Sequence, residues 1–268
     1  MKLRLDNLYA RGGNHSLAID EKGDLYAWGS NSRGQIGNGV NKERSAPIKA
    51  LKNVLRCAAG DDFSLGLTKD GLLYSWGAND YGQLGDASFM SSGKPKLVMN
   101  NVVDIAAGQA HTLAVTNDGD LFAWGLNSNG QLGDGTKVLR NRAEYIMPNV
   151  MSVAAGKFHS MALTRDAILY AFGENSCGQL GLGTKEEALK PRCVMDNIRY
   201  ITAGNFCSLM IALDYTLYGC GKNKGGMFGA TKNSLYPFKI LDGVKTAAIY
   251  ENFRLAQSMN NAFYAWGL

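Results

Sequence analysis

Three histidines are the residues of this chain whose type and spacing could hold a metal ion. His15, His111 and His159 are separated by 96 and 48 residues, so that they fall in one series with a step of 48. Imidazole is a common ligand of zinc and other transition metals. The remaining positions of the series hold Phe63, Cys207 and, after a step of 46, Phe253. Because phenylalanine binds no metal, the series predicts a packing position at which histidine hydrogen-bonds to the backbone, and no metal.

A second candidate chemistry is phosphate binding by the segment GQLGLGTK at residues 178–185. In the phosphate-binding loop that it resembles, lysine directly follows the last glycine and a helix begins. Here Thr184 precedes Lys185, and no helical pattern follows. The chain has no G-x-S-x-G motif and no isolated carboxylate pair, so we expect no catalytic residues and no cofactor. This favours a binding protein, while an enzyme with a site assembled from scattered loops stays open.

The composition limits the kind of partner and compartment. The 268 residues carry a net charge of +5, with 46% apolar and 19% charged residues. This mild charge does not predict nucleic-acid binding, and no apolar run approaches the roughly 18 residues of a membrane helix. The N-terminus has no apolar segment typical of a signal peptide. The five cysteines form no C-x-x-C pair, which predicts small buried residues in a reducing compartment, cytoplasmic or nuclear.

The elements that position these residues follow a repeat of 48 residues. One series of residues with this step is Trp28, Trp76, Trp124, Phe172, Cys220 and, after 46 residues, Trp266. A second series is Gly12, Gly60, Gly108, Gly156 and Gly204. Self-similarity at one fixed period is the signature of a repeat architecture.

Each repeat reads as four short strands, as the third one illustrates. Residues 102–108 form an apolar run that ends in glycine, and residues 111–116 alternate in polarity. The sequence Asn-Asp-Gly at 117–119 predicts a tight hairpin turn, because these residues tolerate a positive φ. A third strand is expected at 120–125, and a fourth short one near 145–148. Four antiparallel strands without helical periodicity predict one propeller blade.

The whole pattern predicts an all-β fold, a β-propeller of six four-stranded antiparallel blades in a single domain, residues 1–268. The repeats are taken as about 12–59, 60–107, 108–155, 156–203, 204–249 and a partial 250–268. The sixth repeat supplies three strands, near 244–249, 253–259 and 262–267. We expect Lys2 to Leu5 to add its fourth strand and close the propeller, which removes exposed sheet edges. Seven blades are the alternative for a truncated chain.

Two further series have expected structural roles. Trp124 and its equivalents should pack against the neighbouring blade, with the adjacent glycines allowing close approach of backbone. The asparagines at fixed phase should brace the loops that follow the third strands. They are Asn31, Asn79, Asn127, Asn175 and Asn223.

The repeat as a whole resembles that of the regulator of chromosome condensation family. Its pattern is A-G-x-x-H-S/T-x-A-L, a D-G turn, and L-Y-x-W-G-x-N-x-x-G-Q-L-G. It is matched by residues 107–115 with 121–133, 155–163 with 169–181, 12–19 with 25–37, and 61–67 with 73–85. The fifth repeat is degenerate, and the sixth ends at Leu268. The resemblance covers nearly the whole chain and implies the propeller fold.

A partner-binding face is expected where the loops vary. In an antiparallel blade, the loop between strands one and two and the loop between strands three and four lie at the same end. The turns at the other end are uniform, whereas these loops vary over a constant frame, which is typical of recognition. The candidate residues on this face are Arg33, Asp61, Asp62, Asp80, Tyr81, Lys157, Phe158 and Phe206.

The resemblance implies a protein-interaction propeller that binds and regulates a small GTPase, Ran- or Rab-like. The family's founding members are nucleotide-exchange factors for Ran, so the chain would be at most a non-covalent exchange factor. Exchange in those proteins resembles insertion of a β-wedge from an enlarged blade, and the steps of 46 and 48 residues leave no room for one. The alternative is a scaffold, substrate-recruiting or enzyme-inhibiting propeller with an unrelated protein partner. We expect a monomer that binds no membrane, from a eukaryote or from a bacterium that delivers it into a host cytosol.

Overall fold

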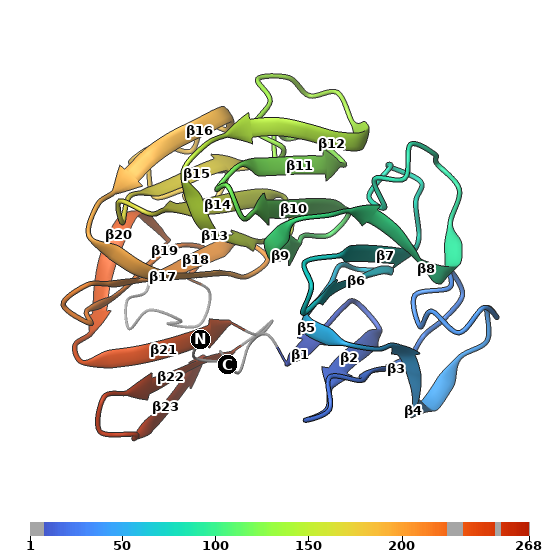
Figure 1. Ribbon diagram of the computed structural model, residues 1–268. Coiled ribbons are helices and arrows are strands. Elements are labelled where there is room, and N and C mark those ends of the chain that lie inside the picture. Colours follow the sequence, from blue (N-terminus) through green and yellow to red (C-terminus); the bar gives the residue numbers. More distant parts are fainter. Residues whose placement is uncertain (1–7, 224–232, 250–252, 268) are drawn as a thin grey trace. The chain divides into compact units, whose positions relative to one another are not determined.

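The computed structural model describes residues 8–223, 233–249 and 253–267. Every regular element in these ranges is a β-strand (Figure 1). The strands form six antiparallel sheets, which we call blades 1 to 6 in chain order. The chain is therefore an all-β protein of the six-bladed propeller class, as the repeat predicts.

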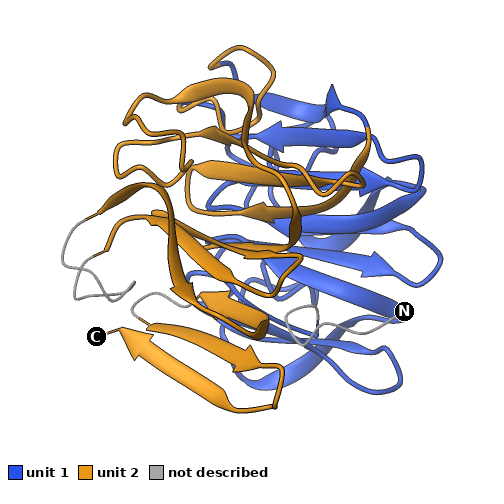
Figure 2. Cartoon of the chain, turned by 90° about the vertical axis from the view of Figure 1, so that its left-hand side faces the viewer, with its two compact units in different colours: residues 1–128, 138–148 blue, residues 129–137, 149–268 orange. Residues whose placement is uncertain are grey.

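Blades 1 to 3 belong to the first of two compact units, which contains residues 1–128 and 138–148 (Figure 2). Blade 1 contains β1 (Tyr9–Arg11), β2 (His15–Ile19), β3 (Leu25–Gly29) and β4 (Arg44–Leu51). Blade 2 contains β5 (Val54–Ala59), β6 (Phe63–Thr68), β7 (Leu73–Gly77) and β8 (Ser92–Met99). Blade 3 contains β9 (Val102–Ala107), β10 (His111–Thr116), β11 (Leu121–Gly125) and β12 (Arg140–Met147).

Blades 4 to 6 belong to the second unit, which contains residues 129–137 and 149–268. Blade 4 contains β13 (Val150–Ala155), β14 (His159–Thr164), β15 (Leu169–Gly173) and β16 (Ala188–Met195). Blade 5 contains β17 (Ile198–Ala203), β18 (Cys207–Ala212), β19 (Leu217–Gly221) and β20 (Ser234–Leu241). Blade 6 contains three strands, β21 (Val244–Ile249), β22 (Phe253–Ser258) and β23 (Phe263–Gly267). The fourth strand predicted at Lys2 to Leu5 lies outside the described residues.

The hairpin turn between the second and third strands is present where the sequence predicts it. Gly119 has a φ of +93°, and its N–H donates to the carbonyl of Thr116 at 2.9 Å. Blade 4 makes the same turn with Ala167, whose φ is +62° and whose N–H donates to the Thr164 carbonyl at 3.0 Å. This turn therefore forms even where a residue with a Cβ occupies the left-handed position.

The fourth strand of each complete blade is longer than predicted. In blade 3 it begins at Arg140, whereas the sequence predicts a short strand near 145–148. Its residues are largely exposed because it is the outer strand of the sheet, bonded to β11 alone. The register shifts within Leu121 to Gly125 also interrupt the alternation of polarity. An exposed, bulged outer strand lacks the apolar periodicity by which the other strands are found.

The tryptophan series packs between blades of unit 1, as predicted. Trp76 is fully buried, and its indole N–H donates to the Gln35 carbonyl of blade 1 at 2.9 Å. A Cβ on Gly37 would lie 2.8 Å from Trp76 Nε1, so only glycine fits against the ring. Trp124 repeats this contact one blade later, with a bond of 3.0 Å to the Gln83 carbonyl. Each junction thus combines apolar burial with a satisfied indole donor.

Two members of the histidine series lie buried in the same junctions, and each hydrogen-bonds to a serine hydroxyl of the next blade. His15 Nε2 is 2.9 Å from the Ser64 hydroxyl of the next blade, and His159 Nε2 is 2.9 Å from the Ser208 hydroxyl. The prediction missed these serines because they come from the following repeat, 49 residues along the chain. Across the described residues, no group of three or more His, Cys, Asp and Glu side chains is placed to hold a metal ion.

Candidate partner-binding face

The loop between the first two strands and the loop between the last two lie at one end of each blade; we call these loops the rim. Backbone bonds join the first loops of successive blades. In unit 1, the Gly13 N–H donates to the Asp61 carbonyl and the Asp61 N–H to the Gln109 carbonyl, each at 3.0 Å. In unit 2, the Lys157 N–H donates to the Asn205 carbonyl at 3.3 Å. The side chains of the rim therefore stand on a fixed backbone frame.

The two loops of one blade are also tied to each other. In blade 5, the Lys222 N–H donates to the Phe206 carbonyl at 2.8 Å, and in blade 4 the Glu174 N–H donates to the Phe158 carbonyl at 2.9 Å. The preceding Gly221 has a φ of +99°, and a Cβ there would lie 2.4 Å from the Phe206 oxygen. Only glycine allows this approach, which explains the Trp-Gly dipeptide of the repeat.

The longer rim loops are braced by the asparagine series, as predicted. Asn79 Oδ1 accepts the Leu84 N–H at 2.9 Å, while its Nδ2 donates to the carbonyls of Ser88 and Met90 at 3.1 and 3.2 Å. Asn31 and Asn175 make equivalent bonds in blades 1 and 4. One buried side chain thus holds both halves of each loop.

The rim of unit 1 brings together three of its five predicted residues. Arg33 forms an ion pair with Asp80 of the next blade and donates to the Ser91 hydroxyl at 3.2 Å. The Asp80 carboxylate raises the pKa of Arg33. Asp62 lies beside this pair, where Gln35 Nε2 donates to its carboxylate at 3.0 Å and its charge acts on Arg33. Such exposed ion pairs add little stability.

The other two predicted residues of unit 1 present free surface. Asp61 is exposed and takes part in the rim frame through its backbone. The backbone N–H of Tyr81 donates to Gln83 Oε1 at 3.0 Å, and the residue is 43% exposed. An exposed tyrosine in a braced loop is typical of the aromatic anchors of interfaces.

The rim of unit 2 holds the remaining three predicted residues and Lys222, which was not predicted. Lys157 Nζ lies 5.4 Å from the ring centre of Phe158, and Lys222 Nζ lies 5.2 Å from that of Phe206. Both rings are half-buried. Lys222 follows the Trp-Gly position of its repeat, where Ser30, Ala78, Leu126 and Glu174 stand in the other blades. The variation of residue type at this repeat position is the sequence signal by which Lys222 could have been recognised as a rim residue.

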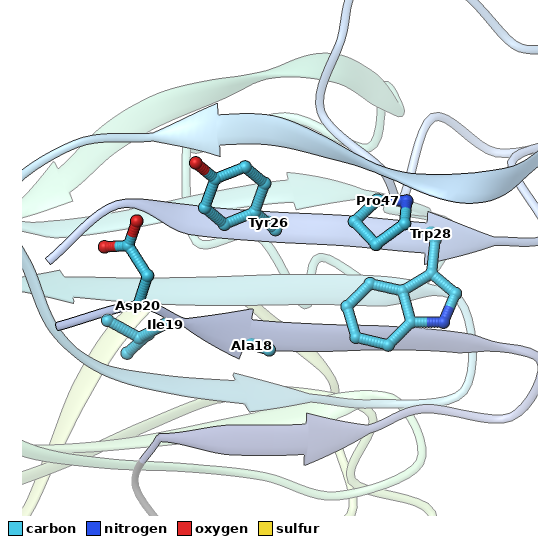
Figure 3. A pocket seen from close by; sticks show the side chains of 6 residues that line it. All are labelled: Ala18, Ile19, Asp20, Tyr26, Trp28 and Pro47. Atoms are coloured by element: carbon cyan, nitrogen blue, oxygen red, sulfur yellow. The ribbon is translucent and has the colours of Figure 1, made fainter. Parts of the chain in front are cut away.

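Away from the rim, the face of blade 1 carries an apolar hollow of about 370 Å³ (Figure 3). Its lining is Ala18, Ile19, Asp20, Tyr26, Trp28 and Pro47. Trp28 is half-buried there, in contrast to the fully buried Trp76.

In the part of the chain that the structure describes, no helix is long and apolar enough to cross a membrane.

A braced rim of charged and aromatic residues on repeated antiparallel blades defines a repeat β-propeller. The chain belongs to the RCC1-like domain family, whose model matches residues 7–268.

Solved structures of similar proteins agree with this family. Prp20p from Saccharomyces cerevisiae, described with its binding properties to Gsp1p and histones, is 28% identical, with a TM-score of 0.85 over 97% of this chain and 71% of that chain. Yeast RCC1 (Prp20) bound to Kap60 is 27% identical, with a TM-score of 0.83 over 97% of this chain and 69% of that chain. Human WBSCR16, at 22% identity, shows the same fold with a TM-score of 0.86 over 99% of this chain and 77% of that chain.

Proposed function

We propose that this chain is a protein-interaction propeller that binds and regulates a small GTPase, Ran- or Rab-like, through its rim. The observation that carries the proposal is the rim itself, in which charged and aromatic side chains project from loops held by backbone bonds and buried asparagines. The similarity to Prp20p, which binds Gsp1p, supports a protein partner of this kind.

The proposed contact residues are Arg33, Asp61, Asp62, Asp80, Tyr81, Lys157, Phe158 and Phe206. They fit what is known of interfaces, in which a few aromatic and charged anchors dominate the binding energy. The frame beneath them is rigid, so little conformational entropy is lost when a partner binds. The Arg33–Asp80 ion pair offers both signs of charge on one exposed surface, which steers association with a partner of complementary charge.

Regulation in this proposal needs no covalent step. A propeller that binds the nucleotide-free GTPase more tightly than the loaded form lowers the affinity of the GTPase for nucleotide by the same factor. The constant spacing of the repeats leaves no room for the β-wedge that the resemblance associates with nucleotide exchange. That uniformity favours, as the second candidate, a scaffold or inhibitor that binds its partner without promoting exchange.

The test is capture of purified Ran- and Rab-type GTPases in the nucleotide-free, GDP-bound and GTP-bound forms. A variant with Asp62→Lys and Phe158→Ala should keep its melting temperature and lose at least about 30-fold in affinity, the equivalent of about 2 kcal/mol at one hot spot. The matched control is Asp118→Lys with Leu213→Ala. It makes the same two kinds of change in exposed turns at the other end of the blades.

Tighter capture of the nucleotide-free form, lost in the rim variant and kept in the control, supports the proposal. Capture that does not depend on nucleotide state favours the scaffold. Loss of binding in the control but not in the rim variant moves the site to the opposite end of the blades and overturns the proposal.

A further inference from the structure

The rim of unit 2 holds two lysine–phenylalanine pairs on adjacent blades. Lys157 covers Phe158 in blade 4, and Lys222 covers Phe206 in blade 5. The Lys157 N–H donates to the Asn205 carbonyl at 3.3 Å, which places the two first loops side by side. The five residues therefore form one continuous surface, which we call the basic–aromatic patch: Lys157, Phe158, Asn205, Phe206 and Lys222.

The positive charges of this patch are not neutralised within the described residues. Basic side chains elsewhere form ion pairs, as Lys96 does with Asp86 at 2.6 Å and Lys239 with Asp242 at 2.8 Å. Neither Lys157 nor Lys222 takes part in any ion pair that these residues make. Among the described residues, these two ammonium groups therefore have no acidic partner.

One acidic side chain belongs to the same surroundings. Glu174 donates its backbone N–H to the Phe158 carbonyl at 2.9 Å, and its Oε1 accepts the Ser176 hydroxyl at 2.8 Å. Its other oxygen, Oε2, is buried and turned away from solvent. Against this carboxylate stand the two ammonium groups of Lys157 and Lys222, so positive charge is in excess among these three side chains.

The position of the ammonium groups decides which anion the patch fits. Each lies about 5 Å from the centre of its ring, so each cation occupies a ring face that a nucleic-acid base would need for stacking. A carboxylate needs only the solvent side of the ammonium group, and the half-buried rings give an apolar floor to a neighbouring side chain. The geometry favours acidic peptide over nucleic acid.

We propose that the basic–aromatic patch binds an acidic peptide segment of a protein partner, with two or more carboxylates that pair with Lys157 and Lys222 and apolar groups that contact the two rings. This inference rests on the proposed role of the rim in partner binding and deepens it by naming the chemistry that half of the rim recognises.

The test is fluorescence anisotropy of a labelled ten-residue peptide of glutamate and leucine, at two salt concentrations. Lys157→Ala with Lys222→Ala should weaken binding about ten-fold, since two exposed ion pairs are lost. The matched control, Lys22→Ala with Lys69→Ala, removes the same charge from turns at the other end of the blades and should change the dissociation constant less than about two-fold. Phe158→Leu with Phe206→Leu keeps the charge and should weaken binding to an intermediate degree.

Equal weakening by the patch variant and the control would show attraction to net charge alone and overturns the proposal. Tighter binding of a labelled single-stranded DNA decamer than of the peptide also overturns it, in favour of nucleic acid. The assay contains no GTPase. Peptide binding without GTPase capture therefore contradicts the proposed function but not this inference. GTPase capture without peptide binding contradicts this inference but not the proposed function.

Discussion

The imidazole of His159 and the hydroxyl of Ser208 join two successive blades by a hydrogen bond of 2.9 Å. Ser208 Oγ donates its own proton to the Gln179 carbonyl at 2.7 Å, so it accepts the proton of His159 Nε2. The other ring nitrogen, Nδ1, is buried without a partner in the described residues. The junction therefore holds a neutral imidazole of defined tautomer, and His15, Ser64 and Gln35 repeat the two hydrogen bonds in unit 1.

Stability should fall as the pH falls from 6.5 to 4. Burial lowers the pKa of His159, and likewise that of His15, to about 4. The unfolded chain therefore binds protons in this window that the folded chain does not. At pH 4, each of the two histidines lowers the free energy of unfolding by about 3 kcal/mol. Urea unfolding at pH 7, 5.5 and 4.5 measures the slope. A His15→Phe, His159→Phe variant should show a shallower slope, since Phe63 already fills the equivalent niche. An unchanged slope would contradict the assignment.

Gly156→Ala should destabilise the fold by about 2–3 kcal/mol through overpacking. A Cβ at this position would lie 2.1 Å from His159 Cε1 and 2.4 Å from the Gly204 carbonyl oxygen, and the second contact is with backbone. The control is Gly243→Asn. Gly243 has a φ of +66° and no atom within 4 Å of an added Cβ, and asparagine stands at this position in other repeats, as Asn149 does with a φ of +64°. Denaturation midpoints should move in the first variant and not in the second.

Trp76→Ala should cost about 3–5 kcal/mol, the range for truncation of a buried large aromatic. The same change at Trp28 should lower the free energy of unfolding by about 1–2 kcal/mol. This ring is only half-buried, so folding removes less of its apolar area from water. The two variants change the same residue type at the same repeat position, so the difference between their unfolding free energies reports the blade contact. Equal losses would show that the contact with Gln35 and Gly37 contributes nothing.

Ala167→Gly should stabilise the protein by about 1 kcal/mol. Ala167 occupies the left-handed turn position with a φ of +62°, where a residue with a Cβ is strained and glycine is not. Ala162→Gly, in the middle of β14, is the control and should destabilise by a similar amount, since glycine weakens a strand. A lower melting temperature for Ala167→Gly would mean that the chain entropy lost by glycine outweighs the strain.

The sequence allowed the strand order, the hairpin turns and the blade junctions to be predicted, because tryptophan, glycine and asparagine mark them with a constant step. The length of the outer strands could not be predicted, since residues such as those of 140–144 face solvent and follow no apolar period. Ser64 and Ser208 were missed as partners of histidine because the bond joins different repeats.

The position of the candidate residues on the rim could be predicted from the sequence, whereas most of their contacts could not. The varied loops pointed to the rim, and the Arg33–Asp80 pair joins two of the residues chosen from them. Lys222 was missed because its contact with Phe206 depends on the backbone bond between two loops of one blade, which no spacing in the sequence reveals. Contacts between side chains of different loops depend on how the loops fold against each other, and the repeat spacing does not reveal them.

The bond between histidine and serine also constrains how such a protein can evolve. In blade 5 the histidine is replaced by Cys207, and in blade 6 the serine is replaced by Arg254, whose Nη2 lies 2.8 Å from the Cys207 sulfur. The two replacements are complementary, so neither repeat could be swapped for a copy of another without leaving its neighbour mismatched. His159 and Ser208 lie 49 residues apart, one more than the 48-residue repeat, so no segment of one repeat length contains both partners. A blade can therefore be exchanged without loss of this bond only together with part of the second strand of its neighbour.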